Sequence, residues 1–206
     1  DLSTLGGKTA GTVTVTNAVA ITGDHDQLTA ALVTESTKVA VSDAAVTIND
    51  ADATSITATE LSAIGGATTG TVTVTNAVAI SGSTAQVTAA LVTAGTLVEV
   101  TDVAVTINDN PTIADLNAIA AKTTGVVTAT LAADSIANLE SLTTAATDAI
   151  TITVNDQDAT EVTAAKLSTL GGKTAGTVTV TNAVAITGNH DQLTAALVTA
   201  STKVEV

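Results

Sequence analysis

The chain carries LSTLGGKTAGTVTVTNAVAITGDHDQLTAALVTESTKVAV at residues 2–41 and repeats it at residues 167–206 with three differences. The three replacements are Asp24 to Asn189, Glu35 to Ala200 and Ala40 to Glu205. Near-identity over so long a stretch indicates a tandem array with a long period of about 165 residues. We therefore expect residues 1–206 to form a single tandem-repeat segment, in which length and regularity matter more than any one pocket.

Valine and threonine alternate with a period of two at eight places, which predicts eight β-strands. These places are residues 12–16, 38–42, 71–75, 97–101, 126–130, 150–154, 177–181 and 203–206. In the full motif, as at residues 71–80, the alternation continues and predicts a strand of about ten residues. After residue 38 the apolar phase slips by one position, which predicts a bulge or a corner.

Short helical patterns of two kinds alternate between these strands. The first kind lies at residues 24–36, 83–95, 135–149 and 189–201, and the second at residues 1–11, 55–70, 111–125 and 160–176. Side chains that suit helix N-caps are Asp24, Ser83, Ser135 and Thr160. The second kind ends in glycine, which predicts left-handed C-terminal residues at Gly11, Gly70, Gly125 and Gly176.

This order of elements predicts an α/β fold, because parallel strands need crossover connections. We expect a parallel-strand solenoid of alternating strands and short helices with two alternating half-repeat types. Strands stack about 4.8 Å apart and helices about 8–10 Å apart, so the two helix kinds fit best on opposite faces. A one-sided, curved solenoid stays open, because alternating faces would require left-handed crossovers.

Composition excludes several classes of function. Twenty acidic residues against six lysines and arginines give a net charge of −14, and the chain has no Phe, Trp or Tyr. Nucleic acid needs clustered cations and often aromatic platforms, so we expect no nucleic-acid partner. No apolar run approaches the roughly 18–20 residues that span a bilayer, so we expect no membrane insertion. The chain lacks an initiator Met and a signal-peptide pattern, and we expect it to be an internal piece of a larger protein.

Acidic corners recur before the second helix kind and suggest a calcium site. Asp50, Asp52, Asp109, Asp156 and Asp158 stand at equivalent places after predicted strands. Oxygen ligands at alternate positions in a turn are what calcium requires, and calcium is the one cofactor that the sequence suggests. The alternative is that Asn and Asp simply form turns and caps there.

No residues form a catalytic pattern, and we expect no enzyme. His25 and His190 are one site in two copies, and a polar loop entering a helix explains both without catalysis. The Thr-Val-Thr-Val-Thr motif also suggests an ice-binding face. However, Ala40, Glu99 and Glu205 fall on the threonine face of the intervening strands and interrupt it.

Two segments carry a resemblance to known proteins: residues 112–156, TIADLNAIAAKTTGVVTATLAADSIANLESLTTAATDAITITVND, and residues 65–80, GGATTGTVTVTNAVAI. They resemble the Thr/Ala/Val-rich tandem repeats of giant secreted or cell-surface bacterial proteins of the cyanobacterial type. The resemblance implies a secreted or cell-surface location and a structural, adhesive or matrix role, and it implies no site residues.

The sequence thus favours a structural segment of a long acidic extracellular repeat protein, such as a surface layer, filament, matrix or adhesin stalk. We expect it to associate with itself or with neighbouring repeats of the same protein. The alternative is a ligand-binding solenoid surface, either a calcium-stabilised adhesin or an ice-binding face.

Overall fold

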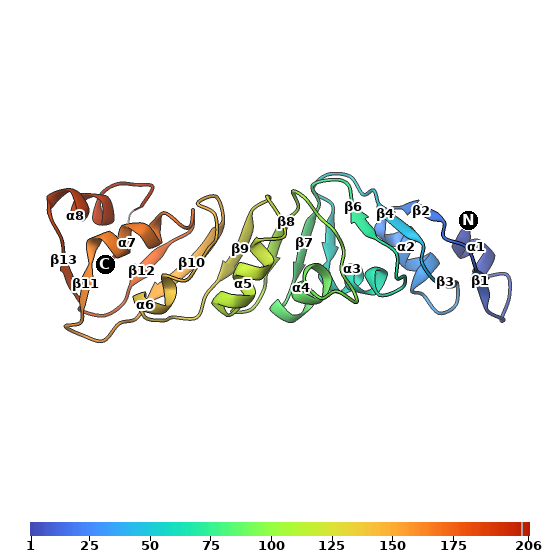
Figure 1. Ribbon diagram of the computed structural model, residues 1–206, viewed down its shortest axis with the longest axis horizontal. Coiled ribbons are helices and arrows are strands. Elements are labelled where there is room, and N and C mark those ends of the chain that lie inside the picture. The colour runs from blue at the N-terminus through green and yellow to red at the C-terminus, as the bar shows by residue number, and fades with distance from the viewer. Residues whose placement is uncertain (203) are drawn as a thin grey trace. The chain divides into compact units, whose positions relative to one another are not determined.

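A computed structural model describes residues 1–202 and 204–206 (Figure 1). Its contacts divide the chain into two compact units, which are described separately. The first unit comprises Asp1–Thr106 and Lys122–Gly125, and the second comprises Ile107–Ala121 and Val126–Val206. Lys203, which begins the last predicted strand, lies outside the described residues.

The first unit alternates short strands with helices of at most eight residues (Figure 1). Its helices are α1 (Leu2–Gly6), α2 (His25–Leu32), α3 (Ala58–Gly65) and α4 (Thr84–Leu91). Its strands are β1 (Val13–Val15), β2 (Ala20–Gly23), β3 (Val39–Val41), β4 (Ala45–Ile48), β5 (Ser55–Thr57), β6 (Val72–Val74), β7 (Ala79–Gly82) and β8 (Ala104–Ile107), whose last residue belongs to the second unit.

The second unit is built in the same way. Its helices are α5 (Ile113–Ala120), α6 (Ile136–Leu139), α7 (Ala164–Gly171) and α8 (His190–Leu197). Its strands are β9 (Val127–Thr130), β10 (Ala149–Val154), β11 (Glu161–Thr163), β12 (Val178–Val180) and β13 (Ala185–Thr187).

Strands pair in parallel with offsets of 21 to 26 residues along the chain. In the first unit Val13 pairs with Val39 and Ser55 pairs with Ala79, offsets of 26 and 24 residues. In the second unit Ile152 pairs with Val178, again 26 residues apart. We call the stretch from one strand to its parallel partner a coil. The prediction of an α/β fold with parallel strands and intervening helices is confirmed.

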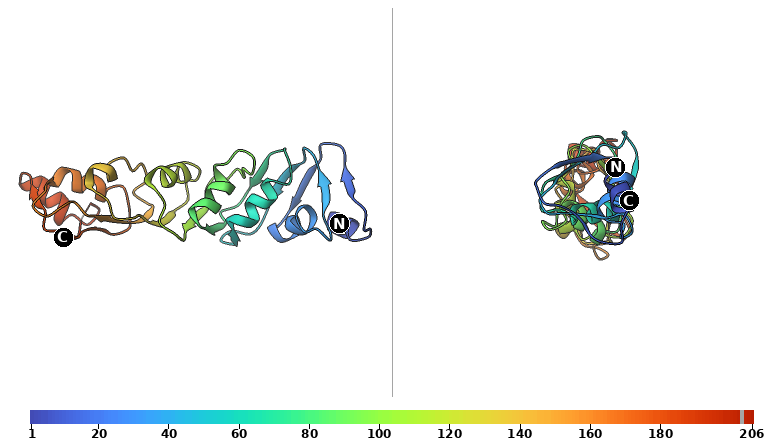
Figure 2. Two further views of the ribbon diagram at one scale, coloured as in Figure 1. Left: turned by 90° about the horizontal axis from the view of Figure 1, so that it is seen from below. Right: turned by 90° about the vertical axis from the view of Figure 1, so that its right-hand side faces the viewer.

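The helices of the first unit follow one another on one side of the strands (Figure 2). Helix α2 packs on α1 and α3, and α3 packs on α4, so both helix kinds stand in one row. The expected placement on opposite faces is therefore wrong for this unit. The two helix kinds differ instead in the number of strands that precede them. Three strands (β3, β4 and β5) precede α3, whereas two (β6 and β7) precede α4.

The core contains only small and branched side chains. No aromatic residue occurs in the chain, and the interior is filled by Val, Ile, Leu and Ala. The largest fully buried side chains are Leu28, Ile48, Ile56, Leu61, Ile64, Ile80, Leu91, Leu116, Ile119, Leu139, Leu142 and Ile150. Every strand thus adds a layer of side chains of similar size and shape, which suits stacking of one coil on the next.

Two predictions about strands need correction. The ten-residue strand expected at residues 71–80 is two strands, β6 and β7, separated by a corner at residues 75–78. The strand expected at residues 97–101 makes only a parallel bridge from Glu99 to Thr73. The slip in phase after residue 38 is confirmed as a corner, because bends at residues 42–43 separate β3 from β4.

Three of the four glycines that were expected to end helices serve another purpose, whereas a Cβ on Gly11 would meet only the side chain of Thr9, at 3.4 Å. Helix α3 ends at Gly65, before Gly70, and no described glycine has a positive φ. A Cβ on Gly70 would lie 2.3 Å from the carbonyl oxygen of Ala44. Gly125 and Gly176 meet the backbone of Val103 and Ile150 in the same way. These glycines let one coil approach the backbone of another closely.

One helix start and one helix length also differ from expectation. Thr163, and not Thr160, caps α7, because residues 161–163 form β11 first. Helix α6 has four residues where residues 135–149 were expected to be helical. Asn117 accounts for the early end, since its side chain bonds the carbonyl of Ser141 and the amide of Thr143 at 2.9 and 2.8 Å.

Candidate functional site

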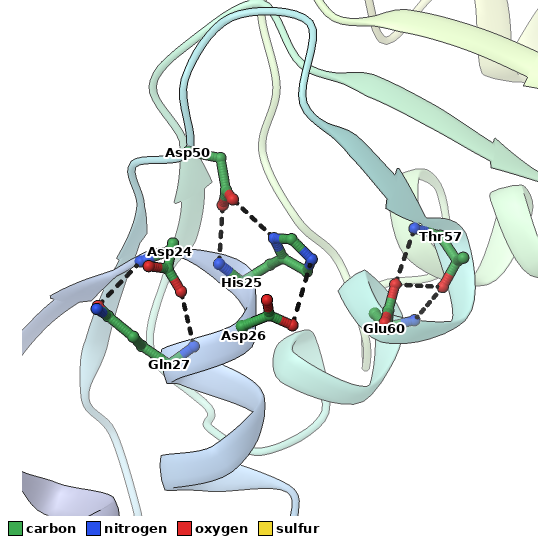
Figure 3. A network of polar contacts seen from close by, with 7 residues as sticks. All are labelled: Asp24, His25, Asp26, Gln27, Asp50, Thr57 and Glu60. Atoms are coloured by element: carbon green, nitrogen blue, oxygen red, sulfur yellow. Dashed lines mark hydrogen bonds and ion pairs between the residues drawn. The ribbon is translucent and has the colours of Figure 1, made fainter.

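The acidic corner after β4 places a buried carboxylate against the start of helix α2. Asp50 is 6% exposed, and its Oδ2 accepts a hydrogen bond from the backbone N–H of His25 at 2.8 Å. Its Oδ1 lies 2.7 Å from Nδ1 of the His25 ring (Figure 3). His25 belongs to the preceding coil, so this pair joins one coil to the next.

The start of α2 explains why Asp50 is needed. Asp24 caps the helix by accepting from the N–H of Gln27 at 2.8 Å, and the Gln27 side chain returns to the N–H of Asp24. This capping box leaves the first helical amide, that of His25, without an acceptor inside the helix. Asp50 supplies that acceptor, and its negative charge also suits the positive end of the helix dipole.

The electrostatics of the pair favour a charged ring. Burial lowers the pKa of His25, but the hydrogen bond and the negative charge of Asp50 outweigh it. The carboxylates of Asp26 and Glu60 act in the same direction, with Asp26 3.6 Å from Nε2. The net result is a pKa above the ordinary value for histidine.

Glu60 stands at the start of the neighbouring helix α3. It accepts from the backbone N–H and the hydroxyl of Thr57 at 3.0 and 2.7 Å (Figure 3). These two hydrogen bonds lower the pKa of Glu60 by stabilising its charged form. Glu60 is therefore a charged neighbour of His25.

Three of the remaining predicted calcium ligands, Asp52, Asp156 and Asp158, accept hydrogen bonds from backbone amides. Oδ1 of Asp52 accepts from the N–H of Ala77 at 3.0 Å, and Oδ1 of Asp158 accepts from that of Ala183 at 3.1 Å. Asp156 accepts from the N–H of Ile136, the first residue of α6, at 2.8 Å. Asp156 thus repeats in the second unit the backbone contact that Asp50 makes in the first.

The corner itself has an unusual backbone. Ala53 and Ala159 adopt φ values of 61° and 62°, in the left-handed region that non-glycine residues seldom occupy. The N–H of Ala53 donates to the carbonyl of Ala77, and Ala159 does the same to Ala183, both at 2.8 Å. Bonds to the following coil therefore hold both corners in this conformation.

The structure does not gather the predicted ligands into one calcium site. Asp50 and Asp52 point to opposite neighbouring coils, and Asp109 lies exposed after β8. Among residues 1–202 and 204–206, no three His, Cys, Asp or Glu side chains are grouped so as to hold a metal ion. The turn-and-cap interpretation describes Asp50, Asp52, Asp156 and Asp158, and calcium binding stays a prediction.

Sequence reasoning missed the pairing of His25 with Asp50. The signal was present, because the two residues are 25 positions apart and the strands beside them pair with the same offset, Ala20 with Ala45. It could be used only once the coil length was known. The second copy, His190, has a side chain that is 90% exposed and lies 3.1 Å from its neighbour Asp191.

The comparisons with known proteins give no family to which the site can be referred. No protein-family profile, curated protein or solved structure matches this chain. None of the described helices is both long enough and apolar enough to cross a membrane.

The rows of threonines on neighbouring strands, here called threonine ranks, are interrupted as the sequence predicted. Thr22 pairs with Thr47 and Thr47 with Thr73, but the next position is Glu99. In the second unit Thr153 pairs with Thr179, which then meets Glu205. Charge therefore ends both of these ranks.

The site joins one coil to the next through hydrogen bonds and opposite charges. The Nδ1 side of the His25 ring faces Asp50 and the Nε2 side faces Asp26, so both ring nitrogens face carboxylates. Asp50 satisfies one backbone amide and one ring nitrogen from the preceding coil. Such a group stabilises a stack and fixes its register.

Proposed function

We propose that this chain is a structural segment of a long, acidic, secreted or cell-surface repeat protein, in which the coils continue as a parallel-strand solenoid. The observation that carries the proposal is that burial of a given residue depends on whether a neighbouring coil covers it. The resemblance to tandem repeats of giant bacterial surface proteins supports the same role. The role of the segment would be to provide length, as in a stalk, filament or matrix.

The two copies of the repeat provide a comparison within one molecule. Leu5 is 53% exposed, whereas Leu170, the same residue in the second copy, is 1% exposed. Val15 is half-buried, whereas Val180 is 6% exposed. Identical sequence is thus buried only where another coil lies beside it, which is the behaviour of a repeat that cannot complete its own core.

The uncovered end of the first unit forms a groove. It has a volume of about 610 Å³ and is lined by residues that include Leu2, Val15, Ile21 and Leu28. In the second copy the equivalents of the first two, Leu167 and Val180, are buried. A further coil of the same kind would fill the groove, so we take neighbouring repeats of the same protein as the natural partners.

A longer array tests this proposal. In a chain of residues 1–166 followed by residues 2–206, the junction reproduces the natural sequence around residue 166. We expect the longest dimension from small-angle X-ray scattering to grow by roughly 30 Å, about six strand spacings, at constant cross-section. We also expect a higher unfolding midpoint, because more interfaces between coils form. A particle that instead grows equally in all directions contradicts the proposal.

A further inference from the structure

The last coil of the second unit exposes a surface that its counterpart in the first unit uses for binding. Residues 167–206 repeat residues 2–41, so the two coils can be compared position by position. In the first copy, the next segment of chain, residues 42–57, covers this surface. That segment supplies the first copy with a parallel strand and a buried carboxylate.

The first contribution is a parallel strand. Strand β4 pairs with β2, with Ala20 opposite Ala45 and Gly23 opposite Ile48. The N–H groups of Ala45 and Asn49 donate to the carbonyls of Val19 and Gly23 at 2.9 and 3.0 Å. The equivalent edge in the second copy is β13, and its neighbour on the opposite side is β11.

The second contribution is the carboxylate of Asp50. It accepts a hydrogen bond from the backbone N–H of His25 and lies within hydrogen-bond distance of Nδ1 of the ring. The His25 side chain is 15% exposed as a result. His190, the same residue in the second copy, is 90% exposed. Burial of the apolar residues changes in the same direction, since Leu28 is 1% exposed and Leu193 only half-buried.

We infer that the edge of β13 together with His190 is a docking surface for one kind of segment: a parallel strand followed by an Asn-Asp corner, as in residues 45–50. This inference rests on the proposed role in a repeat array and names the chemistry by which one repeat recognises the next. The strand supplies main-chain pairing, as in recognition by added strands, and the carboxylate supplies specificity for the correct coil.

The coil that begins the chain does not fit this surface. By the register that pairs Ala20 with Ala45, the residue of that coil in the place of Asp50 is His25, so a copy docked through β2 would bring a histidine and not a carboxylate to His190. A second copy that docked by its first coil would leave the first amide of α8 and the ring of His190 without the partner that Asp50 provides. Head-to-tail contact between separate copies is therefore weaker than continuation by a coil with an acidic corner.

The test extends the full chain by residues 42–106, which follow the first copy of the repeat, placed directly after Val206. We expect hydrogen exchange at the His190 amide to slow by at least tenfold relative to the unextended chain, and the ring signals of His190 to shift. His25 serves as the internal reference, because its amide is already bonded. Asp50→Asn in the appended segment should remove the shift of the ring and most of the protection.

Asp43→Asn in the appended segment is the matched control, since it removes the same charge from an exposed residue whose contact is with its neighbour Ser42. It should leave the protection of His190 unchanged. Equal loss with both substitutions, or no protection of His190 in any extended chain, overturns the inference. Protection of His190 in the unextended chain that grows with protein concentration would assign the surface to a second copy and also overturn it. The proposed array fails separately, if the extended chain is no more stable than the original.

Discussion

Asp50 holds His25 by two hydrogen bonds at once, one to the backbone amide at 2.8 Å and one to Nδ1 of the ring at 2.7 Å. The two residues lie 25 positions apart in the sequence and on successive coils. A single buried carboxylate thus completes the start of α2 and fixes the register of β4 on β2. The helix row and the strand stack are coupled through it.

Loss of this carboxylate should destabilise the first unit. For Asp50→Asn we expect the free energy of unfolding to fall by about 1–3 kcal/mol, because one buried donor loses a charged acceptor. Asp43→Asn is the control, since Asp43 is exposed and accepts its hydrogen bond from the neighbouring Ser42, and it should change stability by less than about 0.5 kcal/mol. Far-UV circular dichroism in a urea series measures both. Equal effects from the two substitutions would show that Asp50 has no special role.

The raised pKa of His25 predicts how stability changes with pH. The folded state binds the proton more tightly than the unfolded state, so the extra stability is fully present below the unfolded pKa of about 6.5. It is lost as pH rises through the higher pKa of the folded protein. Unfolding midpoints measured between pH 6 and pH 9 should therefore decrease with pH. His25→Gln should flatten this decrease, whereas His190→Gln, at an exposed position, should preserve it.

Close approach of the backbone at Gly70 predicts a large effect of a single methyl group. The φ of Gly70 is not positive, but a Cβ would lie 2.3 Å from the carbonyl oxygen of Ala44. Gly70→Ala should therefore lower the free energy of unfolding by about 1–3 kcal/mol, as overpacking does in other cores. Gly95→Ala is the matched control, because nothing lies within 4 Å of the Cβ that it would add. It should be neutral or slightly stabilising. Thermal unfolding of the two variants compares them directly.

The fold class followed from periodicity because the repeat presents the same pattern many times. Six of the eight predicted strands form, and the parallel order follows from the alternation of strands with helices. What failed was the assignment of continuous alternation to continuous strands. At residues 75–78 the apolar pattern runs on, yet the side chain of Asn76 bonds the carbonyl of Asp50 and the chain turns.

The site could be predicted only in part, for a related reason. The acidic residues were recognised as a recurrent feature, and their roles as turns and caps were among the interpretations. Their partners, such as His25 and Ala77, lie about one coil away in sequence. The offset between strands had to be known before Asp50 could be matched to His25. Likewise, nothing local to Gly70 indicates that Ala44 lies against it.

Calcium binding at the acidic corners is the prediction that the structure sharpens most. Asp50 and Asp52 already accept N–H hydrogen bonds, and they point to different coils. At equal ionic strength we therefore expect calcium and magnesium to give the same unfolding midpoint, because both screen the net charge of −14 to the same extent. A specific site would instead add stability with calcium concentration, by about 2.7 kcal/mol at one hundred times the dissociation constant.

Melting curves with calcium, magnesium and a chelator, followed by far-UV circular dichroism, separate these outcomes. Asp52→Asn and Asp158→Asn identify the corner involved, because each removes one exposed carboxylate and leaves Asp50 and Asp156 to hold the amides of His25 and Ile136. A rise in midpoint that is specific for calcium and lost in either variant would contradict our expectation. It would place a metal site at that corner and make the fold a calcium-stabilised one. Equal responses to both cations in all chains would leave the corners as caps that join one coil to the next.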